Sequence, residues 1–250
     1  MTPPDGTRQR VLIVGATSAI AAEVAATFAE RGATLVITGR NAERLAVVES
    51  ELRALGAQVD AIGLDIVDLA AHASVVDRAF AAGDLDVALI AHGVLPDQAR
   101  CQESVAETVR ALEVNFTATV ALLTLLANRF EAQRRGTIAV ISSVAGDRGR
   151  MSNYVYGASK GGLTVFLQGL RNRLAHAGVA VVTLKPGFVD TPMTAAARKS
   201  VLFASPERAG RAIHRAIERR RSVAYIPWFW RPIMSVVRGL PEFIFKRLRF

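Results

Sequence analysis

The segment RVLIVGATSAIA, residues 10–21, decides the fold. Arg10 to Val14 is a short apolar run rich in β-branched side chains, which predicts a buried strand, and a helical period begins near Ala19. Gly15 stands at the turn between them, where the free amides of a helix N-terminus can receive a phosphate. Ala19 and Ala21 occupy the places of the two further glycines that such a turn usually carries.

The same alternation of apolar runs and helical segments continues along the chain. It predicts a Rossmann-type α/β fold, a doubly wound parallel seven-stranded sheet in a single domain. The predicted strands are Arg10–Val14, Thr34–Thr38, Gln58–Leu64, Val87–Ala91, Thr137–Ile141, Val179–Lys185 and Val223–Ile226. The predicted helices are about Ala19–Arg31, Ala42–Leu55, Leu69–Ala81, Ser104–Arg134 as one helix or two, Asn153–His176 and Pro206–Arg219.

Length and composition suit one large domain over residues 1–226, followed by a tail over residues 227–250. The longest apolar run, Phe116–Ala127, is well short of the roughly 20 residues that span a bilayer. Residues 1–10 lack the apolar core of a signal peptide. Cys101 is the only cysteine and lies in a polar connection, so no intrachain disulfide can form. We therefore expect a cytoplasmic protein.

The formal net charge of +9 is concentrated at the C-terminus. Residues 219–250 carry one acid, Glu242, against eight basic side chains: Arg219, Arg220, Arg221, Arg231, Arg238, Lys246, Arg247 and Arg249. The excess of basic residues is therefore a property of the tail and gives no information about the fold. We expect no nucleic-acid partner and no metal site.

A second segment, Ser142 to Lys160, carries the chemistry. Tyr156 and Lys160 are spaced i, i+4 and so share one helix face. A nearby ammonium stabilises a phenolate, and matching a phenol to neutral pH needs a shift of about 3 pKa units. Ser143 follows a predicted strand and would offer its hydroxyl to the same pocket. The alternative is that Tyr-x-x-x-Lys is an accident of helix composition.

Polar positions after the first four strands predict a dinucleotide cleft. Arg40 follows the second strand where an NAD site would carry an acid, which favours NADPH over NADH; the alternative is a solvated arginine. His92 is interpreted as a structural loop residue. The candidate cofactor-binding residues of this cleft are Gly15, Thr17, Ser18, Ile20, Arg40, Asp65, Ile66, Ala91, His92 and Gly93.

Together with Pro186-Gly187-Phe-Val-Asp-Thr191, these motifs resemble the short-chain dehydrogenase/reductase family along nearly the whole chain. The resemblance implies that Ser143 and Tyr156 bind a substrate carbonyl and that Lys160 lowers the tyrosine pKa and holds the cofactor ribose. It also implies that Asn115 anchors a water of the proton relay and that Val189 and Thr191 contact the nicotinamide carboxamide. The sequence departs from the family pattern at Ala19, Ala21 and Ala91-His92-Gly93.

Several segments, including GATSAIA and the aromatic tail, are similar to a narrower group of keto-reductases in arabinan synthesis. Those enzymes reduce a polyprenyl-phosphate-linked 2-keto-pentofuranose after a flavoprotein oxidase partner has made the ketone. Two alternatives stay open: the same chemistry on a soluble or acyl-chain ketone, and a nucleotide-binding scaffold without turnover.

Two surfaces predict partners beyond the substrate. The tail places aromatic side chains from Trp228 onward among basic residues, with Pro232 and Pro241 dividing it into short elements, which suits attachment to an anionic membrane surface at its inner face. The alternative is that these aromatics pack on the body or on a second subunit. The helix Val114–Phe130 is apolar nearly all round, and the resemblance implies a homodimer or homotetramer.

Overall fold

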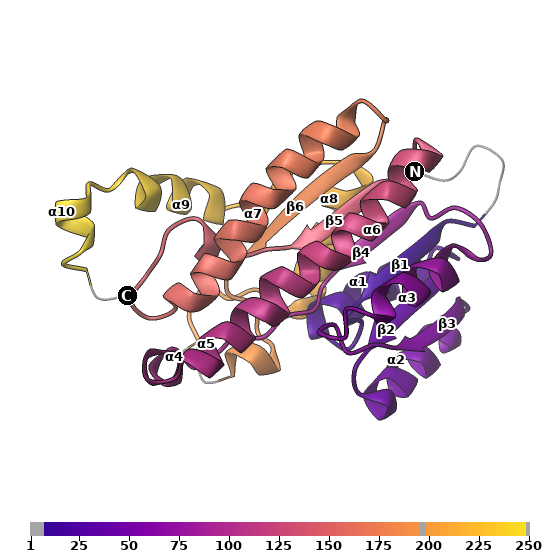
Figure 1. Ribbon diagram of the computed structural model, residues 1–250, viewed down its shortest axis with the longest axis horizontal. Helices are drawn as coiled ribbons and strands as arrows, with labels where there is room; N and C mark the ends of the chain where they lie inside the picture. Colours follow the sequence, from indigo (N-terminus) through magenta and orange to yellow (C-terminus); the bar gives the residue numbers. More distant parts are fainter. Residues whose placement is uncertain (1–7, 196–198, 249–250) are drawn as a thin grey trace.

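The computed structural model describes residues 8–195 and 199–248. Within them, seven strands form one parallel sheet in the order β3-β2-β1-β4-β5-β6-β7 (Figure 1). Every predicted strand is confirmed, with ends that differ by at most one residue. The strands are β1 Arg10–Val14, β2 Thr34–Gly39, β3 Gln58–Gly63, β4 Val87–Ile90, β5 Thr137–Ile141, β6 Ala180–Pro186 and β7 Val223–Ile226.

Helices cover both faces of the sheet, because side chains of successive strand residues point to opposite faces. Leu12 and Val14 of β1 belong to one core, whereas Val11 and Ile13 belong to the other. The first core is closed by α3 Ala71–Phe80, α6 Ala118–Gln133 and α7 Tyr154–Ala175, which lie together in Figure 1. The second core is closed by α1 Ala19–Ala29, α2 Ala42–Ala54 and α8 Pro206–Glu218.

The segment Ser104–Arg134, which the sequence leaves open as one helix or two, forms a single helix from Val105 to Gln133. α5, Val105–Leu112, continues through a π-helical turn, η1 Glu113–Thr117, into α6. By length and composition, the continuous helix Val105–Gln133 is long and apolar enough to cross a membrane. The apolar run Phe116–Ala127 inside it is too short to do so by itself. Leu122, Leu123 and Phe130 are fully buried against the sheet, so we interpret the continuous helix as a core helix.

A short helix that the sequence pattern missed, α4 Gln98–Glu103, precedes α5. Its first turn is capped by the Asp97 carboxylate, which accepts hydrogen bonds from the amides of Ala99 and Arg100. Six residues are too few to show a helical period. Cys101 therefore lies buried in a helix and not in a polar connection.

The strand order reverses between β1 and β4, which opens a crevice at the carboxyl ends of the strands. Gly15 follows β1 with φ +81°, in the left-handed region that glycine adopts without strain. After β5 and β6 the chain forms two short 3₁₀ turns, η2 Val144–Gly146 and η3 Pro192–Thr194, at the same edge. Residues far apart in the sequence thus meet around one crevice.

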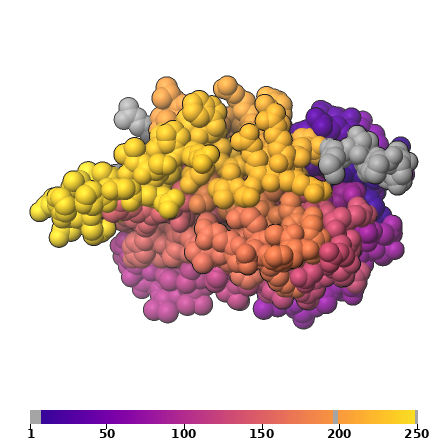
Figure 2. All heavy atoms as spheres, turned by 90° about the horizontal axis from the view of Figure 1, so that it is seen from above, coloured from indigo at the N-terminus to yellow at the C-terminus, as the bar shows by residue number. Residues whose placement is uncertain are grey.

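The tail forms two short elements, α9 Trp230–Gly239 and α10 Glu242–Phe245. Pro232 lies in the first turn of α9, where no helical amide bond is lost, and Pro241 separates the two helices. Trp230 and Met234 are buried against Val144. Beyond them the segment projects from the body, as the yellow atoms of Figure 2 show.

Candidate active site

One cavity of about 420 Å³ lies at the carboxyl edge of the sheet, in the size range of small-molecule sites. Of the predicted site residues, only Asn115 does not line it. The residues that line it are Gly15, Thr17, Ser18, Ile20, Arg40, Asp65, Ile66, Ala91, His92, Gly93, Ser143, Tyr156, Lys160, Val189 and Thr191. The fold therefore brings the dinucleotide turn and the Tyr156 helix to one cavity.

Ser143 and Tyr156 approach each other because η2 packs directly on the backbone of α7. A Cβ on Gly146 would lie 2.6 Å from the carbonyl carbon of Lys160, and one on Gly157 would lie 2.9 Å from the oxygen of Ala145. Real side chains do not come so close, so glycine is required at both positions. These glycines set the spacing between the serine and the tyrosine.

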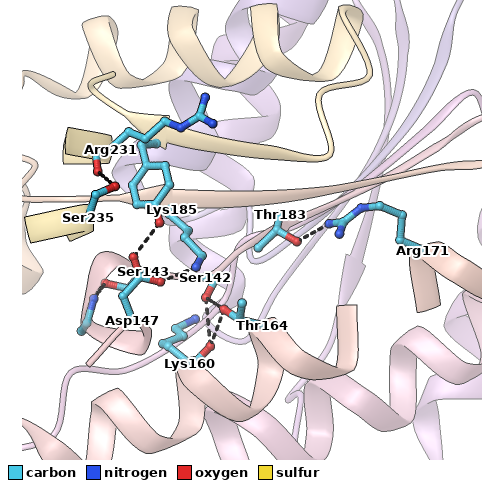
Figure 3. A network of polar contacts seen from close by, with 12 residues as sticks. Ser142, Ser143, Asp147, Lys160, Thr164, Arg171, Thr183, Lys185, Arg231 and Ser235 are labelled. Carbon is cyan, nitrogen blue, oxygen red and sulfur yellow. Dashed lines mark hydrogen bonds and ion pairs between the residues drawn. The ribbon is translucent and has the colours of Figure 1, made fainter. Parts of the chain in front are cut away.

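Side-chain hydrogen bonds hold the same contact (Figure 3). The Ser142 hydroxyl donates to the Lys160 carbonyl oxygen at 3.1 Å and lies 2.9 Å from the Thr164 hydroxyl, which also donates to that carbonyl. Ser143 caps η2, its Oγ accepting a hydrogen bond from the amide of Ala145. All of these groups but Ser143 are buried, so the end of β5 is fixed against α7.

The pKa of Tyr156 differs from what its spacing from Lys160 predicts. Burial raises the pKa of Tyr156 to about 12, and a hydrogen bond with Ser143 acts against it. Burial lowers the pKa of Lys160 to about 8. The Lys160 ammonium donates to the Ile141 carbonyl at 2.9 Å and lies 5.8 Å from the tyrosine ring centroid. The predicted net depression of the phenol pKa is therefore wrong here, because desolvation of the phenol dominates.

Asn115 is buried in η1, and its side-chain amide holds the loop after β4. Its Nδ2 donates to the Val94 carbonyl and its Oδ1 accepts from the Val94 amide, both at 2.8 Å. The amide is thus committed to the backbone. The main-chain carbonyl of Asn115 accepts a hydrogen bond from Thr119 at 3.2 Å in a turn whose π-helical bonding departs from the regular ladder.

Gly15 after β1 and Gly93 after β4 have no room for side chains. A Cβ on Gly15 would lie 2.7 Å from the His92 amide nitrogen, and one on Gly93 would lie 3.0 Å from Asn115 Oδ1. Burial and the charge of Lys160 lower the pKa of His92 to about 3, and its Nε2 pairs with the Thr119 hydroxyl at 2.9 Å. His92 is therefore a neutral structural residue. The bare backbone and the free Ser18 hydroxyl at the start of α1 form a cradle that fits a dinucleotide.

Two arginines lie at the end of the cavity near β2. Arg40 is exposed, and Arg44 on α2 reaches back to donate to the Thr17 carbonyl at 3.4 Å. Arg44 was missed from the sequence because the family motif ends at the strand. Its position one helical turn after Arg40 is the signal that could have found it.

A buried ion pair underlies the serine loop (Figure 3). Asp147 follows η2 and pairs with Lys185 of β6, and both side chains are almost fully buried. Tyr225 of β7 donates to the second oxygen of the Asp147 carboxylate at 2.7 Å. Burial and the Asp147 carboxylate raise the pKa of Tyr225 to about 12. The three residues join the loop after Ser143 to the last two strands.

An aromatic wall formed by Phe188, Phe203 and Trp230 stands beside the cavity. The Phe188 ring stacks on Phe203 with centroids 5.1 Å apart and meets Trp230 edge-on at 5.4 Å. A Cβ on Gly187 would lie 2.0 Å from the Trp230 indole nitrogen, so the indole rests on the backbone at that glycine. Trp230, from the tail, was not among the predicted site residues because tertiary packing alone brings it there.

Comparison with known proteins agrees with this arrangement. The short chain dehydrogenase family matches residues 9–201. An uncharacterized oxidoreductase of Mycobacterium tuberculosis is 40% identical over 95% of this chain and 96% of its own. One of Streptomyces coelicolor is 36% identical over 97% of each chain. The crystal structure of an actinorhodin polyketide ketoreductase variant with NADPH has a TM-score of 0.77 and 23% identity, covering 87% of this chain and 92% of that one. This chain belongs to the short-chain dehydrogenase family and is an oxidoreductase.

Proposed function

We propose that the protein is an NADPH-dependent ketone reductase in which Tyr156 gives the proton. The observation that carries this proposal is that Ser143, Tyr156 and Lys160 line one cavity together with the dinucleotide cradle, close enough for the Ser143 side chain to act on the Tyr156 phenol. NADPH supplies the hydride when bound. The residues of the chain bind the carbonyl, orient it and deliver the proton.

The protonation states favour reduction. With a pKa of about 12, the Tyr156 phenol keeps its proton at neutral pH and can donate it to an oxygen on which negative charge develops. Ser143 holds that oxygen beside the phenol. The Lys160 ammonium then stabilises the phenolate left behind, and the Asn115 carbonyl is the acceptor that would order a water on the path of the returning proton.

Different groups of residues would hold different parts of the cofactor. The cradle at Gly15, Thr17 and Ser18 suits the pyrophosphate, and Val189 and Thr191 suit the carboxamide. Arg40 and Arg44 together suit a 2′-phosphate, which supports NADPH over NADH. The related ketoreductase structure contains NADPH and so agrees with this choice.

We expect Arg40→Ala to reduce the preference for NADPH over NADH. A charge-assisted contact contributes about 1.5–3 kcal/mol, so the preference of the natural protein should be about 10- to 150-fold in affinity, and either Arg40→Ala or Arg44→Ala should remove much of it. Fluorescence titration of both cofactors measures this. NADH is the internal control, since its affinity should change little. Equal affinities for the two cofactors in the natural protein would reject the proposal.

For the substrate we propose a keto-sugar linked to polyprenyl phosphate, as for a decaprenylphosphoryl-2-keto-pentose reductase, with a flavoprotein oxidase as the partner that supplies the ketone. Two features support an amphiphilic substrate. The aromatic wall adjoins the cavity, and the outer side of the tail leaves Trp228, Val236 and Phe243 more than half exposed. The reaction would take place in the cytoplasm at the membrane surface.

The membrane role of the tail needs a test that spares the core. A chain ending at Ile226 would lose the buried Trp230 and Met234, so its aggregation would not distinguish membrane contact from packing. The exposed Trp228 and Phe243 can be changed without opening the core. Each large apolar side chain contributes about 1.5–3 kcal/mol when buried.

We therefore expect the double variant Trp228→Ser, Phe243→Ser to bind phosphatidylglycerol vesicles at least about 10-fold more weakly than the natural protein. Val105→Ser is the matched control, because Val105 is even more exposed than Trp228 and Phe243 but lies on α5. Sedimentation at low and high salt measures binding, and high salt should weaken it by screening the basic residues. Binding that ignores salt, or no binding at all, contradicts the membrane role.

We propose that a homodimer or homotetramer forms through a smaller apolar surface than the whole helix Val114–Phe130. The core of the monomer buries Leu122, Leu123 and Leu126 of α6. On the neighbouring helices, Val109 of α5 and Val165 of α7 remain more than half exposed. These helices pack against each other and offer an apolar surface to a second copy. A monomeric mass by light scattering at micromolar concentration would count against a homodimer or homotetramer.

A further inference from the structure

The cavity carries more positive charge than the cofactor and the proton relay require. Among the described residues that line it there is one acid, Asp65, against five basic side chains: Arg40, Arg44, Arg110, Arg150 and Lys160. Arg40 and Arg44 lie at the cofactor phosphates, and Lys160 belongs to the proton relay. Arg110 and Arg150 have no role in the chemistry described so far.

Arg150 is half-buried in the loop between Ser143 and Tyr156. Its Nε is buried without a hydrogen-bond partner, and within the described residues its guanidinium makes no ion pair. Burial lowers the pKa of the Arg150 guanidinium, although the group remains charged. Burying a charged group without a hydrogen-bond partner costs free energy. An arginine in this state is therefore expected where a bound ligand supplies the missing acceptor.

Arg148, two residues earlier, shows what a structural arginine looks like in the same loop. Its guanidinium donates to the carbonyls of Val237 and Leu240 at 2.7 and 2.6 Å and pairs with Glu242 at 2.9 Å. It also lies 3.7 Å from the centroid of the Phe245 ring. Arg148 therefore fastens the tail to the loop, whereas Arg150 faces the cavity with its donors free.

The position of Arg150 separates it from the cofactor phosphates. The phosphate cradle follows β1, and Arg40 follows β2, whereas Arg150 follows β5, on the side of the carbonyl-binding pair Ser143 and Tyr156. Arg110 lines the same cavity from α5 and is exposed, so its charge is screened by solvent. Arg150 is thus the cation best placed to bind the substrate itself.

We propose that Arg150 binds an oxyanion of the ketone substrate, a phosphate ester or a carboxylate, next to the reacting carbonyl. The planar guanidinium offers parallel N–H donors that match either group. The inference rests on the proposed function for the identity of the carbonyl. It adds that an anionic group, and not only the apolar chain, selects the substrate.

The test compares three ligands that share one chain: geranyl phosphate, geranic acid and geraniol. Their binding to the full-length protein saturated with NADP⁺ is measured by titration calorimetry. We expect the natural protein to bind at least one anion about 10-fold or more tightly than the alcohol. Arg150→Gln should reduce this preference below about 3-fold, and Arg150→Lys should keep part of it. Preference for the phosphate over the acid assigns a phosphate ester, and preference for the acid assigns a carboxylate.

Arg110→Gln is the matched control, since it removes one exposed charge from the same cavity and should retain most of the preference. No preference for an anion in the natural protein, or full preference in Arg150→Gln, overturns the inference. NADPH affinity of Arg150→Gln, measured alongside, shows that the variant is folded. Because no turnover is needed, anion binding by a protein that reduces no ketone would reject the proposed function alone, and ketone reduction without an anion preference would reject this inference alone.

Discussion

Tyr156→Phe is expected to lower kcat for ketone reduction by at least about 100-fold while NADPH affinity is retained. The substitution removes one hydroxyl and leaves the ring, so packing of α7 against η2 is preserved. In the proposed mechanism the lost group is the proton donor, which lies beside Ser143. Steady-state turnover and cofactor titration of the same preparation separate the two effects.

Tyr154→Phe is the matched control for this variant. Tyr154 lies two residues earlier at the start of the same helix, is exposed, and does not line the cavity. It should turn over like the natural protein. Natural turnover in Tyr156→Phe would remove the assignment of Tyr156 as the acid.

The pH dependence of the natural enzyme gives a second readout of the same assignment. Tyr156, with a pKa of about 12, stays protonated throughout the accessible range and should contribute no break. Lys160, with a pKa of about 8, loses its charge as the pH rises through that value, so kcat should be level below about pH 8 and fall above it. Tyr156→Phe should abolish this break, because the neutral phenylalanine leaves no phenolate for the ammonium to stabilise.

The second large effect is expected on stability. Asp147→Asn should lower the free energy of unfolding by about 3–5 kcal/mol, because it leaves the Lys185 ammonium buried without its counter-ion. Tyr225 loses a charged acceptor at the same time. Urea unfolding followed by circular dichroism measures the change. The loop after Ser143 depends on this pair, so kcat should fall as well.

Two comparisons make this prediction specific. Asp60→Asn breaks an ion pair with Arg78 in which both side chains are largely exposed, and it should cost less than about 1 kcal/mol. The double variant Asp147→Leu, Lys185→Met removes both charges and should be more stable than Asp147→Asn alone. A loss for Asp147→Asn no larger than that for Asp60→Asn would show that the buried pair does not hold the loop.

The strands and most helices could be predicted from local sequence, because alternation of apolar runs and helical periods is a property of neighbouring residues. Gly15, Tyr156 and Lys160 were recognisable for the same reason, since their spacing follows a turn or a single helix. The sequence pattern did not predict α4, because a helix of six residues capped by Asp97 is too short to show a helical period of apolar residues. The local pattern left open whether the segment Ser104–Arg134 forms one helix or two, and the structure has one helix that passes through the π-helical turn η1.

The sequence by itself therefore predicted the strands of the sheet, and it predicted the proposed site residues that line the cavity, with Asn115 as the exception. The tertiary structure alone decided the pKa of Tyr156, which burial controls, and the pairing of Asp147 with Lys185 across 38 residues. It also decided the opposite states of Arg148 and Arg150. Arg148 bonds to carbonyls at the end of α9 and just after it, whereas Arg150 lines the cavity. No local pattern distinguishes the two arginines, because the partners of Arg148 lie about 90 residues away in the chain.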